Sequence, residues 1–168
     1  YFKGIAAQIK KEIRLKDKKC LCNDEFYKEI CQSNAVCVHI RLTDFLLKKN
    51  NRFARCTLQY YLNGMNLIEK KVKEPIFYIF TDDIEMAQNM FQFENKRVSY
   101  IPKQYTDIEA FKLMYSCKHY IIANSTYSWW GAYLSEYYDK TVICPEQWFN
   151  DDTDINYLIP KQWIKLSL

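Results

Sequence analysis

Glycine is scarce in this sequence, which has only three, at positions 4, 64 and 131. The dinucleotide fingerprint G-x-G-x-x-G and the phosphate-binding P-loop both need closely spaced glycines, so both motifs are excluded. A nucleotide phosphate would have to be held by other donors, such as an arginine side chain or the free N–H groups at the start of a helix.

Histidine is rarer still: His39 and His119 are the only two, which excludes a multi-histidine metal site. The seven cysteines include no C-x-x-C pair and no second pair at zinc spacing. Cys37 and Cys144 lie in apolar runs, where cysteine behaves as a small hydrophobic residue. We therefore expect reduced thiols, a reducing compartment such as the cytoplasm, and no bound metal.

Long apolar runs are also missing. None approaches the roughly 20 residues that cross a bilayer, and no signal-peptide pattern is present. The net charge of +4 favours an anionic ligand, but the basic residues do not line up with aromatics as in a nucleic-acid binder, so no nucleic-acid partner is expected. The basic stretch 10–19 is interpreted as a solvated helix face, with a peripheral membrane contact as the alternative.

What the sequence does have is an alternation of short apolar runs and helical periods. The apolar runs are "AVCVHI" (35–40), "PIFYIF" (75–80), "RVSYI" (97–101), "HYIIA" (119–123) and "TVIC" (141–144). Helical periods cover 57–72, 83–91, 107–117 and 126–138, the third with Ile108 on its inner face. Runs that are apolar on both faces are typical of parallel strands covered by helices.

This order predicts an α/β fold, a Rossmann-like doubly wound parallel sheet of about five strands. We expect residues 1–34 to form an N-terminal helical segment that links to another domain. Residues 35–168 would form a nucleotide-binding domain, with a loop-rich tail from 146 onward.

Polar residues gather where three of the predicted strands end, and ligands of such sheets bind beyond the carboxyl ends of the strands. The candidate site residues are His39, Arg41, Asp82, Asp83, Ser125, Thr126 and Ser128. Each has a purely structural alternative: a core histidine, a surface ion-pair partner for the arginine, or helix caps for the carboxylates and hydroxyls. Their convergence on one edge favours a single site.

The chemistry of this cluster points to a phosphate. The guanidinium of Arg41 matches phosphate oxygens with two parallel donors. The helix start at 125–128 offers free N–H groups and the positive end of the helix dipole. Asp82 or Asp83 could accept from a purine N–H or a ribose hydroxyl.

Two other motifs are interpreted as structural. Asn124-Ser125-Thr126 matches the N-glycosylation pattern, but its place after a buried strand argues against modification. Asp152-Thr153-Asp154 is a D-x-D, which holds a metal in some sugar transferases. Here it lies in a polar tail, so a loop is expected and no metal is assigned.

Four segments resemble one known family: "VHIRLTDF", "FYIFTDD", "LMYSCKHYIIANSTYSWWGAYL" and "VICPEQWF". From about residue 35 to the tail, the chain is similar to the α-1,2-fucosyltransferases of glycosyltransferase family 11. The resemblance implies the C-terminal, donor-binding half of a GT-B-like enzyme. Such an enzyme transfers L-fucose from GDP-fucose to the 2-hydroxyl of a galactosyl acceptor with inversion, and needs no metal.

Carried over by position, the resemblance makes Arg41 the catalytic residue that binds the donor diphosphate, with His39 beside it. Asp82 and Asp83 would lie near guanine and ribose. The hydroxyls of 125–128 would form the phosphate-side wall, on a helix that Gly131 and the adjacent tryptophans seat on the sheet.

The chain departs from the family pattern twice. The family motif His-x-Arg-Arg-x-Asp has a second arginine, where this chain has Leu42. The Gly-rich opening segment resembling "GGLGNQMFQY" is missing, so we expect the chain to be a fragment. Asp44 is a candidate general base. A non-catalytic nucleotide-binding module, or a transferase for another nucleotide sugar, remains an alternative.

Overall fold

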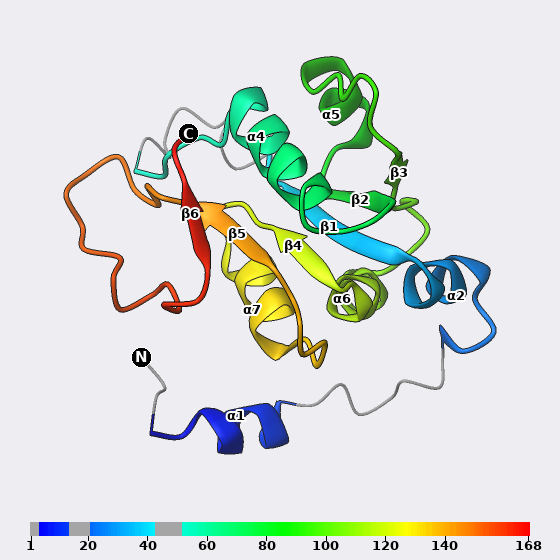
Figure 1. The fold of residues 1–168 in the computed structure, drawn as a ribbon, viewed down its shortest axis with the longest axis horizontal. Coiled ribbons are helices and arrows are strands. Elements are labelled where there is room, and N and C mark those ends of the chain that lie inside the picture. The colour runs from blue at the N-terminus through cyan, green and yellow to red at the C-terminus, as the bar shows by residue number, and fades with distance from the viewer. Residues whose placement is uncertain (1–3, 14–20, 43–51) are drawn as a thin grey trace.

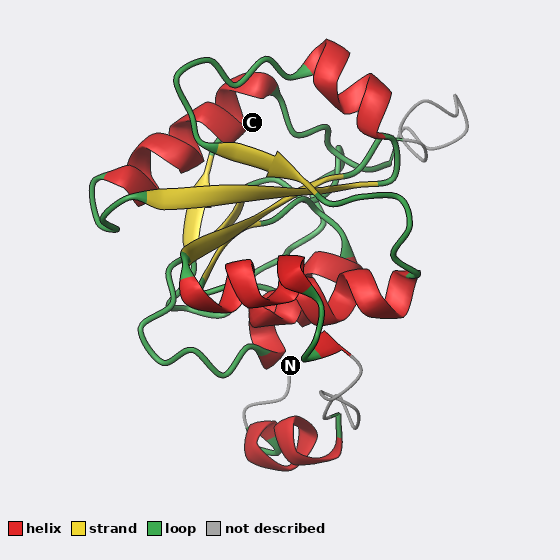
Figure 2. Ribbon diagram, turned by 90° about the vertical axis from the view of Figure 1, so that its right-hand side faces the viewer, coloured by secondary structure: helices red, strands yellow, loops and turns green. Residues whose placement is uncertain are grey.

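The computed structural model describes residues 4–13, 21–42 and 52–168. Within these ranges the chain forms one sheet of six parallel strands, with helices on both faces (Figures 1 and 2). The strands are β1 (Asn34–Ile40), β2 (Pro75–Thr81), β3 (Val98–Tyr100), β4 (His119–Ile121), β5 (Val142–Pro145) and β6 (Ile164–Leu166). The predicted doubly wound α/β fold is confirmed.

From β1 to β5, helices alternate with strands. The described helices are α1 (Ala6–Glu12), α2 (Glu25–Gln32), α4 (Leu58–Glu69), α5 (Ile84–Met90), α6 (Asp107–Ser116) and α7 (Thr126–Leu134). Four of them begin at a residue whose side chain accepts a hydrogen bond from the third backbone N–H of the helix, namely Asp24, Thr57, Asp83 and Thr106. Such caps satisfy N–H groups that have no partner inside the helix.

Alternate residues of the strands build two separate cores. On one face, Cys37, Tyr78 and Tyr120 pack with side chains of α2, α6 and α7. On the other, Val38 and Ile79 join the cluster that includes the buried residues of α4 and α5. This explains why the sequence shows continuous apolar runs: both faces of each central strand are covered.

The strand order is β3-β2-β1-β4-β5-β6. The chain builds outward from β1 to β3, then crosses back to place β4 on the other side of β1. The strand order reverses between β1 and β4. In sheets of this kind the chain segments that follow the two strands run in opposite directions, and a crevice opens between them. That crevice lies beyond the carboxyl ends of β1 and β4.

Two details differ from the sequence-based expectations. The tail contributes a sixth strand, β6, which pairs with β5. The prediction for Ile108 was wrong: it is 68% exposed, because it lies in the first turn of α6 before the helix meets the core. Within the predicted N-terminal helical segment 1–34, α2 packs on the sheet through Ile30, which is fully buried in the core.

Gly131 has a different role from the expected one. A Cβ atom at this position would lie 2.6 Å from the sulfur of Met114, on the neighbouring helix α6. The glycine therefore permits the close approach of α6 and α7 rather than seating α7 on the sheet. Trp129 fixes α7 on its other side, where its indole N–H donates to the carbonyl of Leu158 at 2.9 Å.

Candidate functional site

A cleft of about 770 Å³ lies at the carboxyl ends of the strands. This is in the range of pockets that take small molecules and cofactors. Its lining includes five of the predicted site residues, His39, Arg41, Asp82, Ser125 and Thr126. The cleft therefore joins the end of β1, the end of β2 and the start of α7, as strand-end reasoning predicted.

Arg41 and Asp82 form an ion pair in the lining of the cleft. The Nε atom of Arg41 lies 3.5 Å from one carboxylate oxygen of Asp82, and the arginine side chain is 37% exposed. The other carboxylate oxygen accepts a hydrogen bond from the backbone N–H of Leu42 at 2.9 Å. Asp82 thus fixes both the chain after β1 and one edge of the guanidinium.

His39 is neutral at physiological pH. Burial, and next the neighbouring positive charge of Arg41, lower the pKa of His39 to about 4, while the Asp82 carboxylate opposes this shift. The ring lies 5.8 Å from that of Tyr127, measured between centroids. Its Nδ1 atom is buried and has no hydrogen-bond partner. A buried polar atom without a partner costs free energy, so Nδ1 is suited to a ligand that supplies one.

The start of α7 differs from the other helix starts. Its N-cap residue is Ser125, yet the serine side chain makes no capping hydrogen bond. Among the described helices that begin with Ser, Thr or Asp at the N-cap, it alone lacks this bond. The first N–H groups of α7 thus lack the side-chain acceptor that α2, α4, α5 and α6 have, and they lie beside the cleft that Ser125 and Thr126 line. A helix start of this kind suits an anion, because it presents N–H donors and the positive end of the helix dipole.

Two predicted residues have local structural roles instead. The Asp83 side chain caps α5 by accepting from the N–H of Met86 at 3.0 Å. Ser128 is fully buried, and its hydroxyl donates to the carbonyl of Ser125 at 3.3 Å. Neither residue lines the cleft. Asp83 thus has the capping role that the sequence left open for it, whereas Ser128 lies inside α7 and is not a cap.

The cleft also contains residues that strand-end reasoning did not select. Lys103, Tyr105 and Asp107 follow β3 and line the side of the cleft over β2 and β3. The rule that selected the ends of β1, β2 and β4 would have found them if applied to the weaker run at 97–101. Phe53 and Trp148 come from long loops, and no local sequence signal marks them as part of a site.

The remaining sequence motifs give no further catalytic or metal-binding group within the described residues. Asp44, the candidate base, falls outside the described residues. Asp152 and Asp154 are exposed in a loop, as expected. No group of three or more His, Cys, Asp or Glu side chains that could hold a metal ion occurs within the described residues. Asn124 is 4% exposed, and its amide nitrogen donates to two backbone carbonyls, which leaves no room for a glycan.

Comparison with known proteins relates the chain to one family. The model of glycosyl transferase family 11 matches residues 1–167. The chain is 37% identical over 155 residues to the O-antigen biosynthesis glycosyltransferase WbnK of Escherichia coli, covering 87% of the chain and 50% of that protein. It is 30% identical over 142 residues to an alpha-1,2-colitosyltransferase of Escherichia coli, covering 80% of the chain and 48% of that protein.

The chain therefore spans about half the length of these two relatives. Its parallel sheet with helices on both faces agrees with one half of a GT-B-like enzyme. The family match covers almost the whole chain, including every residue that lines the cleft. The chain belongs to glycosyl transferase family 11.

Proposed function

We propose that this chain is the donor-binding half of a glycosyltransferase that moves L-fucose from GDP-fucose to the 2-hydroxyl of a galactosyl acceptor, with inversion. The observation that carries the proposal is the meeting of Arg41 and the uncapped start of α7 in one cleft. Both supply positive potential and hydrogen-bond donors, and together they suit a diphosphate.

In the proposed reaction the acceptor oxygen attacks the anomeric carbon of the sugar while the bond from that carbon to the phosphate oxygen breaks. Negative charge develops on the leaving diphosphate, and Arg41 with the N–H groups of α7 stabilises it. A preorganised donor of this kind lowers a barrier by about 3 kcal/mol. The proton of the acceptor hydroxyl passes to a base, for which Asp44 is the candidate within this chain.

His39 and Asp82 support Arg41 in this scheme. Asp82 holds the guanidinium in the cleft by pairing with its Nε. His39 stays neutral beside the arginine, and its buried Nδ1 has no hydrogen-bond partner within the protein. We propose that positive groups of the protein replace a metal ion here. Transfer that persists in EDTA would agree with this.

The proposed donor sugar and acceptor are based on the family relationship. One relative is named for transfer of colitose, which is fucose without its 3-hydroxyl. The donor class we propose is therefore a GDP-linked 6-deoxyhexose, with fucose as the specific choice. A galactose-containing glycan is the proposed acceptor. We also propose a cytoplasmic location with a peripheral membrane contact; no helix of the described residues is long and apolar enough to span a bilayer.

The proposal is tested first by binding. Calorimetry with GDP, UDP and ADP on the chain should rank GDP first, and preference for UDP would overturn the fucose assignment. Arg41→Ala should then reduce transfer by the full-length polypeptide by about 100-fold or more while the circular dichroism stays unchanged. Arg41→Lys is the matched variant, because it keeps the charge but loses the paired donors. Activity of Arg41→Ala within threefold of wild type would contradict the proposed role.

One observation favours the second candidate, a nucleotide-binding module without catalysis. Leu42 occupies the position of the family's second arginine, and its side chain is buried in the core beside α4. It does not line the cleft, so Arg41 lacks a neighbouring cation at that position. GDP binding without transfer or hydrolysis of GDP-fucose by the full-length polypeptide would favour this candidate.

A further inference from the structure

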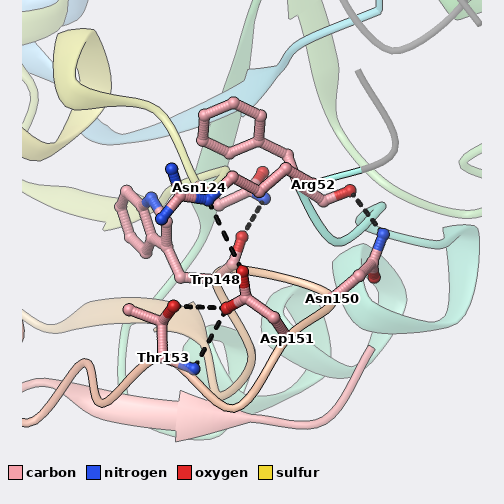
Figure 3. A network of polar contacts seen from close by, with 7 residues as sticks. Arg52, Asn124, Trp148, Asn150, Asp151 and Thr153 are labelled. Carbon is pink, nitrogen blue, oxygen red and sulfur yellow. Dashed lines mark hydrogen bonds and ion pairs between the residues drawn. The ribbon is translucent and has the colours of Figure 1, made fainter. Parts of the chain in front are cut away.

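Asn124 ties two loops to the end of β4. Its amide nitrogen donates to the carbonyl of Ala54 at 2.7 Å. It also donates to the carbonyl of Trp148 at 2.8 Å (Figure 3). The side chain is 4% exposed. The two carbonyls belong to segments that are almost a hundred positions apart in the sequence, so a single side chain sets how these segments approach each other.

The same two segments are bound together outside Asn124. Phe53 and Phe149 form an antiparallel bridge, and the N–H of Asn150 donates to the carbonyl of Arg52 at 2.7 Å. The Arg52 guanidinium lies over the Phe149 ring, 4.9 Å from its centroid. It also pairs with Asp151 at 3.5 Å (Figure 3). Residues 52–54 and 148–151, called here the strap, thus form one connected wall.

The hydrogen bonds of the strap fix the orientation of the Asn124 amide. Both hydrogens of its nitrogen point at carbonyls, so the oxygen must point the other way. That Oδ1 atom is buried and has no hydrogen-bond partner. Asn124 lines the cleft, between Phe53 and Trp148 of the strap on one side and the start of α7 on the other. The cleft wall therefore contains an acceptor held in place and lacking a donor.

The residues that line the cleft come from both sides of β1 in the strand order. Most of them, from Phe80 to Ala110, lie at the ends of β2 and β3 or in the segments that follow, and they include Asp82 and Asp107. Phe53, Asn124 and Trp148 belong to the end of β4 and to the strap. A diphosphate held by Arg41 and α7 would direct its nucleoside, the larger group, toward the larger set, where carboxylates can accept from a purine. The sugar would then contact the smaller set.

On the basis of the proposed function, we infer that Phe53, Asn124 and Trp148 form the donor-sugar subsite, and that Asn124 determines specificity there. The Oδ1 atom accepts a hydrogen bond from a sugar hydroxyl. The aromatic side chains offer an apolar surface to the methyl group of a 6-deoxyhexose. A hexose with a hydroxyl at C6 would bury that hydroxyl against apolar atoms, which is unfavourable. The strap thereby selects the sugar, while Arg41 and α7 bind the diphosphate.

The test compares GDP with GDP-L-fucose and GDP-L-galactose, each titrated into the chain by calorimetry. The wild-type chain should bind GDP-L-fucose more tightly than GDP, and more tightly than GDP-L-galactose, which differs from it only by a C6 hydroxyl. Asn124→Ala should lower the affinity for GDP-L-fucose by about tenfold, consistent with the loss of one buried hydrogen bond and its alignment, while the affinity for GDP changes less than twofold. Phe53→Leu should narrow the difference in affinity between GDP-L-fucose and GDP-L-galactose.

Gln59→Ala is the control, because Gln59 is exposed on α4 and belongs neither to the strap nor to the cleft lining. It should leave all three affinities within twofold. If Asn124→Ala does not fold, as judged by circular dichroism, Phe53→Leu decides the question.

The possible failures are distinguishable. A chain that does not bind GDP contradicts the proposed function itself. GDP binding with no extra affinity for GDP-fucose overturns the subsite alone. Equal losses for GDP and GDP-fucose in Phe53→Leu would mean that the strap holds the guanine base, and this too would overturn the inference.

Discussion

At His39 a buried ring and a nearby cation produce a measurable dependence of stability on pH. The unfolded chain has an ordinary histidine pKa near 6.5, whereas the pKa in the fold is about 4. As pH falls below 6.5, the unfolded state gains a proton that the folded state does not. The free energy of unfolding should therefore be highest above pH 7, and the His39 contribution should lower it by about 2 kcal/mol by pH 5. Urea unfolding at pH 7.5, 6 and 5 measures this.

The control for this prediction uses the second histidine. Burial also lowers the pKa of His119, so it contributes to the same loss. His39→Gln and His119→Gln should each flatten the pH profile, and the comparison of slopes removes any constant cost of the substitution. A profile of His39→Gln as steep as that of the wild type would show that the ring is not the source.

Single residues also show where sequence reasoning reaches its limit. Arg41 and Asp82 were predicted to face the ligand separately, but Asp82 pairs with Arg41 and receives the N–H of Leu42. No spacing rule reveals a pairing between side chains 41 positions apart. The opposite holds for Asp83, whose capping role could be read from its place directly before a helical period.

On the scale of the element, the N-terminal starts of α6 and α7 can be compared directly. Thr106 and Glu109 form a reciprocal capping box at the start of α6. Thr106→Ala should therefore lower the free energy of unfolding by about 1 kcal/mol. Ser125→Ala should change it by less than about 0.5 kcal/mol, because no capping bond is lost, yet it should weaken GDP binding. Urea unfolding and calorimetry of both variants provide the measurement.

An equal loss of stability in the two variants would contradict the conclusion that the start of α7 is uncapped. The prediction therefore separates a helix start built for stability from one left open for a ligand.

The contact between α6 and α7 gives a second test at this scale. Gly131→Val should destabilise the chain by about 2 kcal/mol, because the added atoms meet the buried Met114. Gly4→Val is the control, since a Cβ there meets nothing within 4 Å. Thermal unfolding followed by circular dichroism measures both. If Met114→Ala restores stability to Gly131→Val, the clash is the cause; if it does not, the loss arises elsewhere.

Element by element, the longest apolar runs were the most predictable. The runs at 35–40 and 75–80 became β1 and β2, because a strand buried on both faces must be apolar throughout. β6 was not predicted, because it has only three residues and an exposed lysine at its centre. Its pairing depends on β5 being in place, which is a property of the assembled sheet.

For the whole molecule, a ligand in the cleft should stabilise the entire fold. A ligand that binds only the folded state at 100 times its dissociation constant adds about 2.7 kcal/mol. For a chain of this size that corresponds to a rise in Tm of roughly 5–10 °C. Saturating GDP should produce this shift, and UDP at the same concentration a smaller one. Arg41→Ala should abolish the shift, and an unchanged shift in that variant would place the nucleotide elsewhere.

The fold class was predictable at this scale, while the order of the strands was not. Alternating strands and helices indicate a parallel sheet, but several orders satisfy that pattern. The observed order places β1 beside β4 and so brings Arg41 to the start of α7. The strap could not be predicted from the sequence either, because Asn124 joins Ala54 to Trp148 through main-chain carbonyls that any residue could supply.

The two outermost strands of the sheet, β3 and β6, have only three residues each. Every strand border exposes unpaired peptide groups that can recruit another chain, and brevity keeps that opportunity small. The two seven-residue strands, β1 and β2, both lie inside the sheet, where each is paired on both sides. The short outer strands thereby discourage self-association into extended fibrils through the borders of the sheet.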